Sequence, residues 1–130
     1  MKNKPTHLYE YSIVRIVPDL ARGECLNVGL IMMCKKQRWV KVRFGVDASR
    51  ILAVAPGFDI RELTNQLQSF QRIAEQDTAL GGDISALDAH ERFRWLTAVR
   101  SATIQTSAPH CGLSDDLDGT FDRLFAQLVL

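Results

Sequence analysis

Polar side chains of the types that bind anions or move protons gather in three stretches of this 130-residue chain, residues 22–27, 92–101 and 105–115. Guanidinium groups hold phosphates and carboxylates through paired hydrogen bonds, and a nearby glutamate or histidine can transfer a proton. One hypothesis is therefore a small phosphate-like or carboxylate ligand between Arg92, Arg100 and His110, close to an expected helix start. The candidate site residues are Arg22, Glu24, Asn27, Arg92, Arg100, Ser101, Ser107 and His110.

Each of these groups also has a structural explanation, and the sequence leaves both open. Arg22 and Glu24 can form a surface ion pair, which is worth about 0–1 kcal/mol. Glu24 and Asn27 are three residues apart, so on a regular strand they point to opposite faces unless a bulge intervenes. Asn27 can instead bond to the backbone of a nearby loop. Arg100 lies at an expected helix end, where the helix dipole favours a cation.

Familiar catalytic motifs are missing from the sequence. It contains no GxSxG, Walker A, HExxH or GxGxxG pattern. His110 and Cys111 are adjacent, but a zinc site needs three or four ligands, and neighbours in sequence are seldom positioned as nucleophile and base. We therefore expect no metal, no cofactor and no cysteine nucleophile, and an enzymatic function is the less favoured hypothesis.

The first half of the chain predicts three strands. Aromatic and β-branched residues fill Leu8 to Val17, and an apolar run extends from Glu24 to Cys34. From Trp39 to Val46 apolar residues alternate with Lys41 and Arg43, which predicts a hairpin with one solvated side.

A two-residue loop at Lys36 and Gln37 would set the register of this hairpin. The expected cross-strand pairs are Met33 with Val40, Ile31 with Val42, and Gly29 with Phe44. In this register Gly29 leaves room for the Phe44 ring, which explains a glycine inside an apolar strand by packing alone.

Helical patterns dominate the second half. Asp47 can cap a short helix that Pro56 and Gly57 end, Asp59 and Glu62 have capping-box spacing ahead of a longer helix, and Ser85 and Asp88 repeat that spacing for a third helix ending near Arg100. A fourth strand over residues 101–107, a loop over 108–112 and a last helix from Ser114 or the adjacent aspartates should follow. The order βββαααβα predicts an α+β fold with a mostly antiparallel four-stranded sheet and helices packed on one face.

Composition limits the classes of partner and compartment. The length and the 46% apolar content suit a single domain over residues 1–130. The net charge of +1 makes nucleic acid an unlikely partner class, so an anion site must be local. Three cysteines without a CxxC pair fit a reducing compartment, and neither a signal peptide nor a membrane span is recognisable. We expect a cytoplasmic protein.

The segments "YSIVRIVPDLARGECLNVGLIM" and "ERFRWLTAVRSATIQTSAPHCGLSDD" resemble the bacterial domain-of-unknown-function family 3037, from about Tyr9 to the carboxyl terminus. Its pattern R-G-E-x-x-N-x-G falls on Arg22, Gly23, Glu24, Asn27 and Gly29. The patterns R-F-x-W-L and R-S followed by S-x-x-H-x-G fall on Arg92, Phe93, Trp95, Leu96, Arg100, Ser101, Ser107, His110 and Gly112. Cys111 stands where threonine is usual in the family, and no activity, cofactor or catalytic residue comes with the resemblance.

The resemblance also implies a partner, since proteins of this type are often encoded beside a HipA-like kinase. The leading hypothesis is a small non-catalytic protein that docks on such a kinase in a toxin–antitoxin or stress-response pair. The contact surface would be the face of Lys41 and Arg43, or the arginine and histidine region. The alternative is an enzyme or binding domain for a phosphorylated small molecule or nucleic acid. In it Arg22, Arg92 and Arg100 hold phosphate, and Glu24 or His110 is the proton-transfer group.

Overall fold

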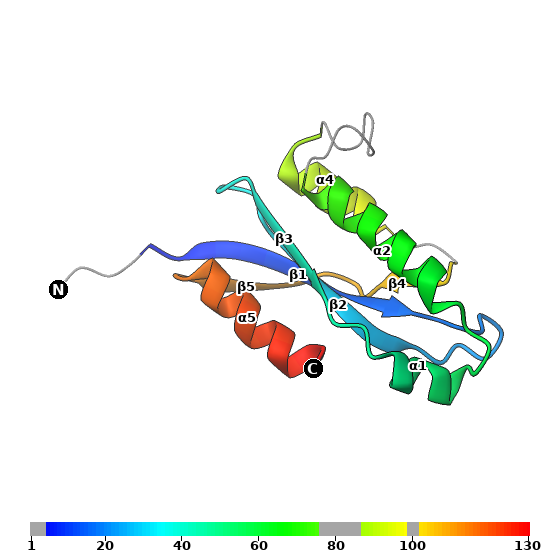
Figure 1. Ribbon diagram of the computed structural model, residues 1–130. Helices are drawn as coiled ribbons and strands as arrows, with labels where there is room; N and C mark the ends of the chain where they lie inside the picture. Colours follow the sequence, from blue (N-terminus) through cyan, green and yellow to red (C-terminus); the bar gives the residue numbers. More distant parts are fainter. Residues whose placement is uncertain (1–4, 76–86, 99–101) are drawn as a thin grey trace.

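A five-stranded antiparallel sheet forms the centre of the molecule in the computed structural model, which describes residues 5–75, 87–98 and 102–130 (Figure 1). The strands are β1 (His7–Ile16), β2 (Leu26–Cys34), β3 (Trp39–Phe44), β4 (Ile104–Thr106) and β5 (His110–Ser114). β2 lies between β3 and β1. Along the other edge of β1, β5 pairs with residues 7–11 and β4 with residues 14–16. The predicted α+β class with a mostly antiparallel sheet is confirmed.

The helices start where aspartates cap them. They are α1 (Ala48–Val54), α2 (Ile60–Ala74), α4 (Ala89–Leu96) and α5 (Leu117–Leu128). The predicted caps Asp47 and Asp59 accept hydrogen bonds from the Arg50 and Glu62 backbone N–H groups, and Asp116 caps α5. Asp88 is the N-cap residue of α4, and the expected cap Ser85 lies outside the described residues.

Helices cover both faces of the sheet, so the expectation of helices on one face is wrong (Figure 1). α2 and α4 pack on one face in a cluster that we call the α2/α4 core, and α5 packs on the other in the α5 core. Ile31 and Met33 belong to the first cluster, whereas Leu30 and Met32 belong to the second. The apolar run of β2 therefore reflects a strand buried on both sides.

The face of Lys41 and Arg43, expected to be solvated, contacts α5 at its edge while both side chains stay partly exposed. Lys41 Nζ lies 2.9 Å from Asp118 Oδ1, and Arg43 Nη1 lies 3.0 Å from Asp122 Oδ1. Both cations also lie over the Phe121 ring, with the charged group 5.1 Å from the ring centroid in each case. The alternation of β3 agrees with the prediction, and carboxylates far along the chain add partly exposed ion pairs on its polar side.

A bulge in β2 determines where Asn27 points. Val14 pairs with Gly29 but Arg15 pairs with Asn27, so Val28 is an extra residue in β2. The side chains therefore change face at this point, and Val28 joins the α2/α4 core. Asn27 reaches the other side of the sheet, where its Nδ2 donates to the Leu128 carbonyl at the end of α5, 3.0 Å away.

The strand β5 occupies the segment that was expected to be mostly loop. Its sequence HCGLS lacks the β-branched and aromatic residues that usually signal a strand. Pairing with β1 holds it instead, and Gly112 lies opposite Tyr9. A Cβ at Gly112 would overlap the Tyr9 ring, so the glycine lets this buried aromatic side chain lie across β5. The element order is therefore βββαααββα within the described chain.

The predicted hairpin register is confirmed, including Gly29 opposite Phe44. A Cβ at Gly29 would overlap the Phe44 ring and come within 3.0 Å of the Arg43 carbonyl oxygen. The ring itself is held by an edge contact with Phe70 of α2, with centroids 5.9 Å apart. In residues 5–75, 87–98 and 102–130, no helix has the length and apolar content needed to cross a membrane.

Replacing Gly29 by alanine should lower the free energy of unfolding by about 2 kcal/mol, because the added methyl overpacks this contact. Urea denaturation measures the change. Gly57→Ala is the matched control, since a Cβ there meets nothing within 4 Å. Phe44→Leu should recover part of the loss in the double variant. Equal stabilities of the Gly29→Ala and Gly57→Ala variants would contradict this explanation.

Candidate functional site

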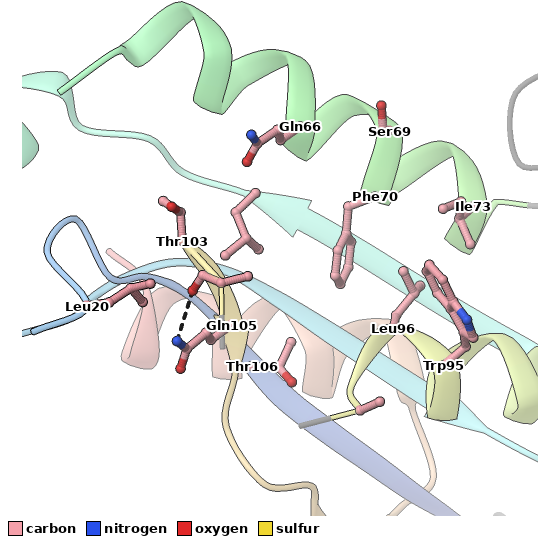
Figure 2. Close-up of a pocket in the computed structure, with 13 residues that line it drawn as sticks. Leu20, Gln66, Ser69, Phe70, Ile73, Trp95, Leu96, Thr103, Gln105 and Thr106 are labelled. Atoms are coloured by element: carbon pink, nitrogen blue, oxygen red, sulfur yellow. Dashed lines mark hydrogen bonds between the residues drawn. The ribbon is translucent and has the colours of Figure 1, made fainter. Parts of the chain in front are cut away.

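A groove of about 540 Å³ opens between α2, α4 and β4 (Figure 2). Its apolar lining is formed by Leu20, Phe70, Ile73, Trp95, Leu96 and Ile104. Gln66, Ser69, Thr103, Gln105 and Thr106 add amide and hydroxyl groups. None of the lining residues in the described chain carries a charge, so the groove suits apolar or neutral groups.

The amphipathic helix α2 presents one stripe to the core and a neighbouring one to the groove. Leu63 and Leu67 are buried against the sheet. Gln66, Phe70 and Ile73, spaced four and three residues apart, line the groove beside them. In Figure 2 the Phe70 ring points from α2 toward the sheet. Packing in the core therefore fixes this wall of the groove.

The polar side chains of the groove present hydrogen-bond acceptors to a ligand, because most of their donors already bond within the protein. Gln105 Nε2 donates to the Ala102 carbonyl at 2.9 Å (dashed in Figure 2). Thr106 Oγ1 donates to the Thr97 carbonyl at 3.3 Å, and Gln66 Nε2 donates to Glu62 at 3.2 Å. Within the part of the chain that the structure describes, no donor reaches the amide oxygens of Gln66 and Gln105. These oxygens can accept N–H or O–H groups from whatever enters the groove.

Arg92 is used inside the fold rather than in a ligand site. Its side chain is buried, with 5% of the residue exposed. Nε donates to the Ala74 carbonyl at 3.2 Å, and Nη1 donates to the Leu87 carbonyl. Burial lowers the pKa of the guanidinium from its ordinary value, and the charge of Asp88 partly offsets this effect. Arg92 thus joins the end of α2 to the segment before α4.

The sheet separates Arg92 from His110. α4 belongs to the α2/α4 core, whereas the exposed His110 ring stacks on Tyr11, with centroids 5.3 Å apart. Tyr11 packs against the α5 core on the opposite face. The structure therefore does not bring these two candidate anion ligands together. Arg100, the third member of the predicted site, lies outside the described residues.

The remaining candidates make local contacts. Arg22 and Glu24 form an exposed ion pair beside the turn between β1 and β2. Ser107 is buried, where its Oγ accepts from the Ile13 N–H at 2.9 Å and donates to the Ala108 carbonyl at 3.2 Å. Ser101 lies outside the described residues. The candidates that the structure describes are thus spread over separate places.

Sequence reasoning missed the groove because its walls are distant in the sequence. The helical periodicity that includes Phe70 and Ile73 predicts a core stripe, and nothing in it shows that these side chains also line a groove. Trp95 was an available signal in the sequence, since it stands among charged residues. In the structure this side chain of α4 remains 40% exposed. In the part of the chain that the structure describes, no group of three or more His, Cys, Asp or Glu side chains is placed to hold a metal ion.

Arg92→Met should lower the free energy of unfolding by about 2–3 kcal/mol, because two buried carbonyls lose their donor. Arg94 provides the control on the same helix. It forms an exposed two-pronged ion pair with Glu10, so Arg94→Met should cost less than about 1 kcal/mol. Denaturant unfolding measures both variants. A loss for Arg92→Met no larger than that for Arg94→Met would contradict the structural role.

Comparison with known proteins agrees with the motif patterns. The family model described as protein of unknown function (DUF3037) matches residues 11–129, nearly the whole chain. No curated protein and no solved structure gives a match. The chain therefore belongs to the DUF3037 family.

Proposed function

We propose that this domain is a non-catalytic binding module that docks on a partner protein and modulates it. The partner implied by the family resemblance is a HipA-like kinase, within a toxin–antitoxin or stress-response pair. The contact surface proposed here is not the face of Lys41 and Arg43, because these residues form ion pairs with α5.

The observation that carries the proposal is the uncharged groove with large apolar side chains exposed beside it. Leu20 is 51% exposed and Trp95 is 40% exposed, and both line the groove. Exposed apolar patches of this kind mark interaction sites, and tryptophan is enriched among the residues that dominate binding energy. An apolar side chain of the partner would fill the space over Phe70 and Ile73.

Hydrogen bonds would then orient the partner. The free amide oxygens of Gln66 and Gln105 lie in the same groove and can accept from the partner's backbone N–H groups. Such a combination of an apolar centre and a few directed polar groups is common at specific interfaces.

The alternative function, a domain acting on a phosphorylated small molecule or nucleic acid through Arg22, Arg92 and Arg100, receives less support. Arg92 donates to two backbone carbonyls, and His110, one of the two proposed proton-transfer groups, stacks on the opposite face of the sheet. The other, Glu24, is paired with Arg22 at the surface.

Co-expression with the kinase encoded beside the gene tests the proposal. We expect the two proteins to co-purify and to elute together on sizing at micromolar concentration. Trp95→Ala and Leu20→Ser should each weaken the complex by about tenfold or more, because each removes apolar contact at the groove.

Leu113→Ala is the matched control, since Leu113 is 69% exposed but lies on β5, away from the groove. Its affinity for the kinase should equal that of the unaltered domain. Circular dichroism confirms that each variant is folded. Two separate monomeric peaks on sizing, or equal losses from the groove and control variants, would contradict the proposal.

A further inference from the structure

A second cavity, of about 430 Å³, lies between the β2–β3 turn and the start of α4. It is lined by Lys35, Lys36, Arg38, Asp88, Ala89 and His90. We propose that this cavity binds a phosphorylated sugar or a similar small phosphorylated polyol. The basic residues take the phosphate, and Asp88 accepts a hydroxyl group of the sugar.

The concentration of positive charge is the first argument. The whole chain has a net charge of +1, yet Lys35, Lys36 and Arg38 fall within one turn beside this cavity. Ion pairs in the described part of the chain use other cations, namely Arg22, Lys41, Arg43 and Arg94. The three turn residues are exposed and keep their charges available for an anionic group.

The backbone of the turn supports the same conclusion. Arg38 has φ 48°, in the left-handed region that glycine adopts at lower cost, and its N–H donates to the Lys35 carbonyl at 3.1 Å. Here the conformation closes the turn while keeping a guanidinium beside the cavity.

Asp88 gives the site its second chemical feature. Asp47, Asp59 and Asp116 each accept a backbone N–H in the first turn of their helices, whereas the Asp88 side chain accepts none from the first turn of α4. Its carboxylate oxygens can therefore accept a ligand hydroxyl. The first-turn N–H groups of α4, beside His90, add favourable dipoles for the phosphate.

Together these features select the ligand class. A cavity of 430 Å³ lies within the range of small-molecule sites. The Asp88 carboxylate weakens the attraction of the three cations for a bare anion but hydrogen-bonds to a hydroxyl, so the arrangement favours a molecule that carries both groups. The site does not share lining residues with the groove between α2, α4 and β4, and the inference stands apart from the proposed docking function.

Titration of the ¹⁵N-labelled domain with ribose 5-phosphate, inorganic phosphate and ribose tests the proposal. We expect saturable shifts of the backbone amides of Lys36 and His90 with ribose 5-phosphate. Inorganic phosphate should shift the same amides with about tenfold weaker affinity, and ribose alone should leave them unchanged. Absence of saturation with ribose 5-phosphate at millimolar concentration would overturn the proposal.

Variants separate a specific site from general attraction to positive charge. Arg38→Gly relaxes the turn while removing the guanidinium, so a loss of about tenfold in affinity cannot come from backbone strain. Lys35→Glu with Lys36→Glu should abolish binding. Arg61→Glu with Arg123→Glu, at exposed positions of α2 and α5, makes the same change in net charge and should leave affinity within about twofold.

Asp88→Ala tests the recognition of the sugar, because alanine has no side-chain oxygen to accept a hydroxyl group. This variant should bind ribose 5-phosphate no more tightly than inorganic phosphate, while denaturant unfolding confirms that the domain stays folded. Equal losses in the double charge variants at the cavity and at the control positions would overturn the proposal. So would an Asp88→Ala variant that retains the full preference for ribose 5-phosphate.

Discussion

Burial of β2 on both faces is the constraint on which the rest of this structure depends. Every residue from Val28 to Cys34 is buried, with alternate side chains entering the α2/α4 core and the α5 core. In a strand in this position, an unpaired polar side chain costs free energy. Asn27 therefore binds the end of α5, and the bulge at Val28 turns its side chain to that face. The sheet therefore separates the polar groups on its two faces.

This separation explains why the residues of the family pattern that the structure describes lie in different places. Gly29 makes space for Phe44, Asn27 holds α5, and Arg92 satisfies two carbonyls next to α4. Each residue type is required by packing or by hydrogen bonding. The two proposed binding surfaces lie elsewhere in the described chain, in the uncharged groove beside Trp95 and in the basic cavity beside Arg38.

Much of the fold could be predicted because local signals and the final structure agree. Alternation in β3 and the tight turn before it determine the register of Gly29 and Phe44, and Asp47 and Asp59 cap helices by contacts within three residues. The position of α5 depends instead on Phe121 and Phe125 packing against β2 residues such as Leu30, far earlier in the chain. Local patterns carry no information about such long-range contacts, so the sequence did not show that α5 lies beside this face of β3.

The candidate sites were less predictable for the same reason. The candidate arginines and His110 are easy to identify in the sequence. Whether their side chains can bind a ligand depends on burial and on their hydrogen-bond partners, which only the fold shows. The sequence indicates an ordinary turn at Lys35, Lys36 and Arg38. Only the fold places these residues next to Asp88 and His90. Likewise, Phe70 has the spacing of a core residue, and only the fold shows that it lines a groove together with residues of α4 and β4.

Hydrogen–deuterium exchange of the domain with and without the HipA-like kinase tests most directly the claim that the groove is the docking surface. The account predicts slower exchange in the segments that line the groove, residues 66–73, 95–98 and 103–106, and unchanged exchange across α5. Protection confined to α5 or to β5, with the groove segments unaffected, would contradict it.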